Sequence, residues 1–228
     1  MASLSDFLQH FDRTRFLMLL LSAAASLLCI TFHELSHGWT AYRLGDPTAK
    51  QAGRLTLNPI RHIDWLGLAM MLTVRVGWAK PVPVDMRYFR HPKRDMALTA
   101  LAGPLSNFLL ALVALLAANL VLRFSGGGEW SVYVLLFLLY VAVLSVGLSI
   151  FNLIPVSPMD GSKILLALLP DRAYYTVLRY ERFGMIAIVA LTWLGVFSRP
   201  LSFLMEHLLQ GMCVVTRFPF SLVQYFFF

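Results

Sequence analysis

The chain has 228 residues, of which 58% are hydrophobic and only 14% are charged. Soluble globular domains are about 45–50% apolar and about 25% charged, so this composition excludes a disordered chain and argues against a soluble domain. Lys and Arg exceed Asp and Glu, and the formal net charge is +7. Because no basic stripe with interleaved aromatic residues accompanies this charge, we expect no nucleic-acid partner.

Three apolar runs predict membrane-spanning helices, which need about 20 mostly apolar residues each. They cover residues 16–41, 97–122 and 132–151. Before them, residues 1–15 have apolar side chains at helical spacing and predict a short helix on the membrane surface. A signal peptide is the alternative for residues 1–32. Two shorter apolar stretches within 184–216 predict a C-terminal helical hairpin.

The basic residues predict the orientation of the chain. Segment 41–96 contains ten Lys and Arg residues and segment 153–183 contains four, whereas 123–131 contains only Arg123. Because cytoplasmic loops are enriched in Lys and Arg, we expect both basic segments on the cytoplasmic side of a cell membrane. In this multi-pass arrangement the end of the first span that carries His33 and His37, and any active site built there, is expected towards the cytoplasm.

Segment 41–96 contains two stretches that alternate like β-strands, at 54–57 and 73–76. The apolar residues between them are too few to cross a bilayer, so we expect a membrane-associated β-hairpin or re-entrant segment. Non-helical backbone is tolerated inside the bilayer only where other parts of the protein or a water-filled cavity cover it. The predicted fold is therefore an α-helical polytopic membrane protein, in which residues 1–228 form one domain with a three-helix core, this segment and a C-terminal helical pair.

Residues His33-Glu34-Leu35-Ser36-His37 lie within the first predicted span. Histidines four residues apart share one face of a helix, so two ring nitrogens can bind one metal ion. Glu34 is close enough to reach a metal-bound water without being a ligand, as in a zinc site with a carboxylate general base. Ionisable residues within a span are costly and indicate function. The alternative is that neighbouring helices satisfy the three polar side chains.

A catalytic zinc ion usually has three protein ligands, so a third ligand must come from elsewhere. We favour Asp160, because Pro155, Pro158 and Gly161 around it predict a broken helix that directs the carboxylate inward. Alternatively, Asp160 is the N-cap of the following helix, which is compatible with metal binding. The other candidates are His10, His62, His91, His207, Asp64, Glu181 and Glu206.

Asn107 lies inside the second predicted span, where a polar side chain should face the protein interior. It is expected either to form a hydrogen bond between helices or to stabilise a developing oxyanion. Cys29, one turn before His33, is expected to be a small buried apolar side chain rather than a metal ligand.

His33, Glu34, His37 and Asn107 lie in short sequence blocks that follow one another in a fixed order along the chain. By these blocks the chain resembles the site-2 protease family of intramembrane zinc metalloproteases, peptidase family M50, in particular its small bacterial and archaeal members. The blocks are 32–38, 42–49, 53–59, 62–64, 77–84, 102–107 and 151–155, followed by Asp160 and Gly161. The resemblance implies that one zinc ion is bound by His33, His37 and Asp160, and that Glu34 activates the attacking water. It also implies that segment 77–84 lies near a substrate that adds to it as a strand.

The chain departs from the family at two positions. Trp65 stands where the family commonly has proline, and Ser162 where a second glycine is frequent. Neither change affects the expected metal ligands.

The expected function is zinc-dependent hydrolysis of peptide bonds in or near the transmembrane segment of a membrane-protein substrate, with Asn107 as a second catalytic residue. Membrane lipid is the other expected partner, and the sequence does not indicate an oligomeric state. Two alternatives are an inactive membrane binding protein that keeps the protease fold, and a metal transporter that uses the same ligands.

Overall fold

The computed structural model describes residues 13–65, 67, 79–170, 172–174, 176 and 181–228. Within these residues the secondary structure is helical, and no strand occurs. The expected surface helix falls mostly on residues 1–12, which lie outside the described residues.

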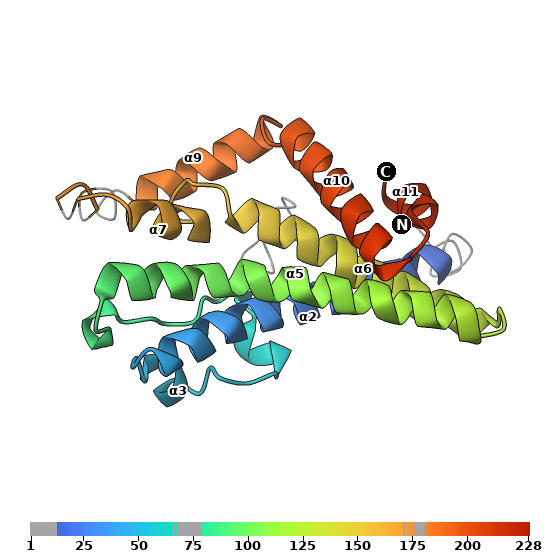
Figure 1. Cartoon of the computed structure of the whole chain (residues 1–228), viewed down its shortest axis with the longest axis horizontal. Helices are drawn as coiled ribbons and strands as arrows, with labels where there is room; N and C mark the ends of the chain where they lie inside the picture. Colours follow the sequence, from blue (N-terminus) through green and yellow to red (C-terminus); the bar gives the residue numbers. More distant parts are fainter. Residues whose placement is uncertain (1–12, 66, 68–78, 171, 175, 177–180) are drawn as a thin grey trace, which may run out of the picture.

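Three long helices form the core, and each is long and apolar enough to cross a membrane. They are α2 (Arg13–Arg43), α5 (Pro92–Phe124) and α6 (Glu129–Asn152). Each contains one of the three expected spans and extends beyond it at both ends, which confirms helices at the three predicted positions. A short turn joins α5 to α6, and α2 packs against both of them (Figure 1).

Small side chains line the contacts between the core helices. Ala25 and Cys29 of α2, Ala111 and Ala118 of α5, and Ala142 of α6 are almost completely buried. Small residues let helix backbones approach closely in a membrane, where van der Waals packing drives association. Large apolar side chains cover the outer faces of the same helices, as expected for surfaces in contact with lipid.

The segment between α2 and α5 contains only short helices: α3 (Thr48–Gln51), η1 (Pro59–His62) and η2 (Met86–Tyr88). The predicted strand at 54–57 is wrong. The amide of Thr56 donates to the carbonyl of Arg54 at 3.0 Å, and the carbonyl of Thr56 lies 3.0 Å from His62 Nε2. The polar groups of this stretch therefore have local partners instead of a neighbouring strand. The second predicted strand, at 73–76, lies outside the described residues.

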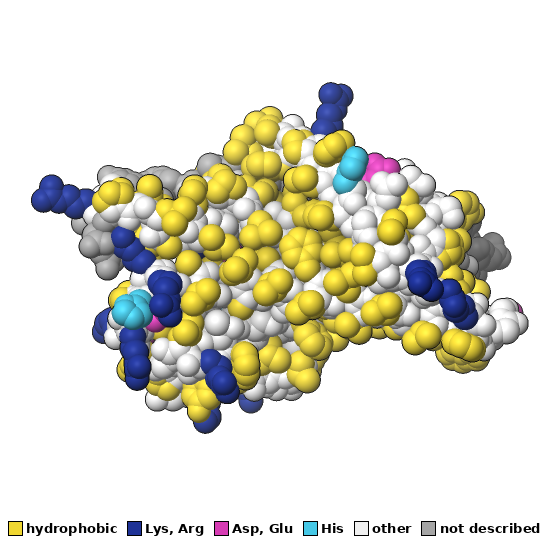
Figure 2. Space-filling view, viewed as in Figure 1, with side chains coloured by type: hydrophobic (Ala, Val, Ile, Leu, Met, Phe, Trp, Pro, Cys, Tyr) yellow, Lys and Arg dark blue, Asp and Glu magenta, His cyan; other side chains and the backbone are white. Residues whose placement is uncertain are grey.

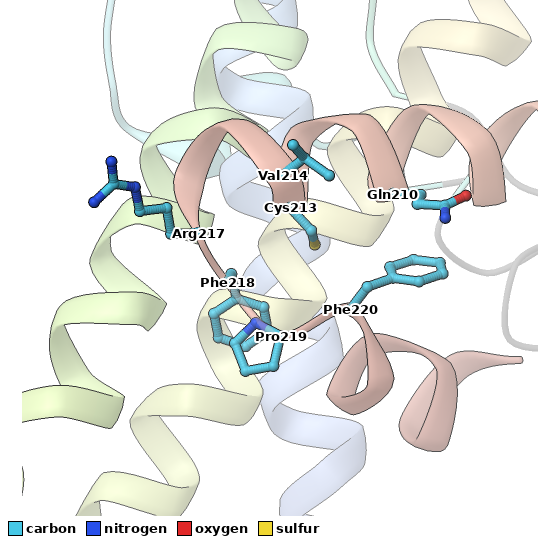
Figure 3. Close-up of a pocket in the computed structure, with 7 residues that line it drawn as sticks. All are labelled: Gln210, Cys213, Val214, Arg217, Phe218, Pro219 and Phe220. Atoms are coloured by element: carbon cyan, nitrogen blue, oxygen red, sulfur yellow. The ribbon is translucent and has the colours of Figure 1, made fainter.

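After α6 the chain forms α7 (Asp160–Leu166), α9 (Glu181–Trp193), α10 (Ser198–Thr216) and α11 (Phe220–Phe227). Helices α9 and α10 occupy the positions of the expected C-terminal pair, and α10 packs against α5 and α6. Helix α11 was not predicted from the sequence. A hollow of about 410 Å³ is lined by the end of α10 and the beginning of α11, at the end of the core opposite α7 (Figures 1 and 3).

The charged side chains are unevenly distributed over the molecule. Figure 2 shows many Lys and Arg side chains gathered at the end where α3 and the beginning of α5 lie, while hydrophobic side chains cover the middle. The basic end is also the end at which α7 begins (Figure 1).

Candidate metal centre

Three buried side chains meet where α2, α5 and α7 come together. His33 and His37 come from α2, and Asp160 is the first residue of α7. The Nε2 atoms of His33 and His37 each lie 3.1 Å from Asp160 Oδ2. One ligand atom from each residue lies within 4.8 Å of the other two. Two histidines from one helix and a distant carboxylate therefore converge on one point.

The orientation of His37 shows that this cluster fits a cation. His37 Nδ1 lies 2.7 Å from the carbonyl oxygen of Thr99 on α5. Because a carbonyl only accepts, Nδ1 carries a proton, and Nε2 of the neutral ring presents its lone pair to Asp160 Oδ2. Two acceptors facing each other are stabilised only by a proton or a metal ion between them. Two imidazoles and a carboxylate are typical zinc ligands.

Two glycines make room for this cluster. A Cβ atom at Gly103 of α5 would lie 2.4 Å from His37 Nε2 and 2.7 Å from His33 Cε1. A Cβ atom at Gly161 would lie 2.2 Å from the carbonyl oxygen of Leu153, which follows the end of α6. Glycine at these positions allows α5 to approach the histidines, and α7 to begin close enough to α6 to bring Asp160 inward.

The environment of Asp160 keeps its carboxylate ionised. Burial alone raises the pKa of the Asp160 carboxyl, but the adjacent rings of His33 and His37 and the nearby charge of Lys163 hold it well below its usual range. Lys163 Nζ lies 3.6 Å from Asp160 Oδ1. Sequence reasoning missed Lys163, although a cation three residues after a carboxylate on a helix is a recognisable pair. The alternative that Asp160 is an N-cap is wrong, because Met159 occupies the cap position.

Glu34 lies beside the cluster rather than in it. Its side chain is half-buried, and its Oε2 accepts a hydrogen bond of 2.8 Å from the amide of Val82. The carboxylate is thus held by the segment that precedes η2. Glu34 is not one of the three residues whose ligand atoms converge.

Asn107 lies one helical turn beyond Gly103, on the same face of α5. Its side chain is fully buried, and within the described residues neither its amide nitrogen nor its oxygen has a hydrogen-bond partner. The expected hydrogen bond between helices is therefore not seen in this part of the chain. An unpaired buried amide is costly, so the two polar atoms of Asn107 require a further partner such as a buried water.

Among the side chains that the structure describes, no other sequence candidate joins the cluster. His62 is buried and bonds to the Thr56 carbonyl, Asp64 accepts from the amide of Gly67, and His207 Nδ1 lies 2.8 Å from the carbonyl of Phe203. Cys29 is buried in the core, as expected, with its Sγ 3.1 Å from Ser145 Oγ. His10 lies outside the described residues.

Comparison with known proteins identifies the family. Residues 120–195 match the model of peptidase family M50. A Bacillus subtilis protein named as zinc metalloprotease YwhC is 38% identical over 175 residues, which cover 72% of this chain and 76% of the relative. The chain belongs to peptidase family M50, the site-2 protease family. As an M50 protein it is a zinc metalloprotease, a hydrolase of peptide bonds, and three apolar helices agree with a membrane protein.

Two further relatives match a smaller share of the chain. A Mycobacterium tuberculosis protein named as zinc metalloprotease Rip2 is 31% identical over 144 residues, covering 60% of this chain and 53% of Rip2. Zinc metalloprotease MJ0392 of Methanocaldococcus jannaschii is 30% identical over 147 residues, covering 64% of this chain and 33% of the relative. No solved structure matches the chain.

Proposed function

We propose that this M50 protein is an intramembrane endopeptidase in which His33, His37 and Asp160 bind zinc and Glu34 is the general base. The observation that carries the proposal is the convergence of three buried ligand atoms within 4.8 Å. Two of the three residues belong to α2, which is apolar enough to span a membrane. A hydrolytic centre in such a helix is suited to a substrate that itself lies in the bilayer.

The substrate class follows from this setting. The substrate is the transmembrane segment of another membrane protein, cleaved in or near the bilayer. A helical substrate must unwind locally, because its peptide carbonyls and amides are engaged in hydrogen bonds between residues four apart. The basic end of the molecule supports an orientation with the metal centre towards the cytoplasm (Figure 2).

The side chains around the metal centre have distinct roles in the proposed reaction. Bound zinc supplies a Lewis acid that polarises the scissile carbonyl and acidifies a water. Glu34 accepts the proton of the attacking water and returns it to the leaving amine. The unpaired amide of Asn107 donates a hydrogen bond to the carbonyl oxygen as negative charge develops on it. Thr99 holds His37 in the tautomer that leaves Nε2 free.

Replacing Glu34 tests the proposed base separately from the metal ligands. Glu34→Gln keeps the size of the side chain but cannot accept the proton, so we expect cleavage to fall by at least about 100-fold while zinc stays bound. Asp160→Ala should instead lose zinc. Membrane proteins that accumulate on the Glu34→Gln variant are candidate substrates, to be incubated in detergent with the zinc-loaded wild type.

The matched control is Glu129→Gln, because Glu129 is exposed in the first turn of α6. This variant should cleave at the wild-type rate. Full activity of Glu34→Gln would contradict the assignment of the base. Zinc flux into liposomes without any cleavage would favour the transporter alternative.

A further inference from the structure

Segment 79–85 runs past α2 without regular secondary structure, and we call it the strap. Hydrogen bonds attach it to residues near α2 at both ends and in the middle. The amide of Lys80 donates to the carbonyl of His62 at 3.0 Å, and the amide of Asp85 donates to Asp46 Oδ2 at 2.7 Å. Between these points, the amide of Val82 donates to Glu34. The strap is therefore fixed on either side of its contact with Glu34.

The strap packs closely on α2 at Gly38, one turn after Glu34. A Cβ atom at Gly38 would lie 2.9 Å from Val82 Cγ1 and 2.8 Å from Leu55 Cδ2. Val82 thus contacts α2 through both its side chain and its amide. A small displacement of the strap would alter the hydrogen bond to Glu34.

Arg54 binds carbonyl oxygens of the strap, whereas Glu34 binds an amide of it. Its side chain is buried, with 6% relative exposure, and its Nη2 donates to the carbonyls of Lys80 and Pro81. Within the described part of the chain, no carboxylate forms an ion pair with Arg54. A buried charge must have polar partners. The guanidinium of Arg54 therefore depends on the strap carbonyls, and the position of the strap depends on Arg54.

The carbonyl of Pro81 and the amide of Val82 belong to the same peptide unit, which is planar and rigid. Arg54 binds the oxygen of this unit at 3.3 Å, and Glu34 binds its N–H at 2.8 Å. A cation on the carbonyl side polarises the peptide and strengthens donation from the amide side. Pro81 and Pro83 further restrict the backbone on either side of Val82. A shift of Arg54 is thus transmitted directly to the carboxylate.

We propose that Arg54 is a positioning residue for Glu34 and acts through the Pro81–Val82 peptide. The inference rests on the proposed role of Glu34 as general base. Among the described residues, no hydrogen bond or ion pair joins Arg54 to Glu34 or to the metal ligands. Its loss lowers the rate of the chemical step, because misplacement of a catalytic group by about 1 Å can cost about 100-fold in rate.

The test compares Arg54→Gln and Arg54→Lys in purified, zinc-loaded protein. For Arg54→Gln we expect kcat to fall about 10- to 100-fold, KM to change less than about twofold, and zinc content to stay at the wild-type level. Arg54→Lys keeps the charge and one donor and should recover part of the rate. The matched control is Arg61→Gln, since Arg61 is an exposed arginine in η1, and this variant should match the wild type.

A second measurement does not require activity. Hydrogen exchange of a peptide covering the strap includes the amide of Val82 as one of five in residues 79–85, because Pro81 and Pro83 have no amide hydrogen. We expect faster exchange in Arg54→Gln and in Glu34→Ala than in the wild type. If Arg54→Gln does not fold, Arg54→Lys should show a smaller increase in exchange than Glu34→Ala, and Gly38→Ala, whose Cβ would lie 2.9 Å from Val82 Cγ1, should also speed exchange by displacing the strap.

The outcomes separate this inference from the proposed function. Unchanged kcat, or a rise in KM alone, in Arg54→Gln would overturn the role of Arg54 while leaving Glu34 as the base. Unchanged exchange of the strap would overturn it as well. Failure of the wild type to cleave any transmembrane substrate would instead overturn the proposed function, and the exchange result would still report whether Arg54 holds the strap against Glu34.

Discussion

The two carboxylate oxygens of Asp160 have different partners. Oδ2 lies 3.1 Å from both histidine Nε2 atoms, and Oδ1 lies 3.6 Å from Lys163 Nζ. Lys163 is one turn further along α7, so the short helix carries both the carboxylate and the cation that orients it. This arrangement leaves one oxygen free to act as a metal ligand. Groups that orient a metal ligand contribute to metal affinity although they do not touch the ion.

Lys163→Met should therefore weaken zinc binding. We expect the affinity to fall by about 10- to 100-fold, because Asp160 loses the partner that fixes its carboxylate. Competition with a zinc chelator on purified protein measures this change. Lys163→Arg should keep most of the affinity, and Lys50→Met, which removes an exposed lysine of α3, is the control. Equal affinity of Lys163→Met and the wild type would exclude this role.

At the scale of elements, the contact of α2 with α5 and α6 depends on small side chains. Ala25 has 0% exposure, whereas Ala24, the preceding residue of α2, is exposed on the outer face. The same substitution at these two neighbouring positions therefore separates packing between helices from helix propensity and hydrophobicity.

Ala25→Leu should destabilise the core. Extra methylene and methyl groups in a packed interface force side chains and backbone apart, so we expect the free energy of unfolding to fall by about 1–3 kcal/mol. Ala24→Leu, which points outward, should change it by less than about 0.5 kcal/mol. Denaturation in detergent micelles, followed by circular dichroism, compares the two variants. Similar stability of both variants would argue against tight packing at Ala25.

The elements differ in how far they could be predicted from sequence. The three long helices follow from runs of apolar residues, a local property, and the His33 and His37 pair follows from helical spacing. The strand at 54–57 was wrong because alternation of side chains does not reveal that the polar groups of Thr56 have partners within the segment. The role of Arg54 depends on strap carbonyls 26 and 27 residues away, which no local pattern reveals.

On the scale of the whole molecule, the two ends of the core are different. Basic side chains gather at the end that carries α3 and the start of α5, close to the start of α7 (Figures 1 and 2). The turn between α5 and α6, which includes Ser125, lies at the opposite end (Figure 1). If the basic end is cytoplasmic, this turn faces the outside of the cell.

Single cysteines test this orientation. Ser125 and Gln51 are exposed at opposite ends, and the native Cys29 and Cys213 are buried and should react little. We expect a membrane-impermeant maleimide to label Ser125→Cys in intact cells, but to label Gln51→Cys only after the membrane is permeabilised. The reverse pattern would place the metal centre on the outer side.

The distance along the chain between the proposed metal ligands has a consequence for biosynthesis. Asp160 follows His33 by 127 residues, and α5 and α6 lie between them. A chain that has inserted α2, α5 and α6 still lacks its third ligand until α7 leaves the ribosome and folds against the end of α6. If these three residues are the zinc ligands, the unfinished chain lacks its full ligand set and is inactive while it is being made.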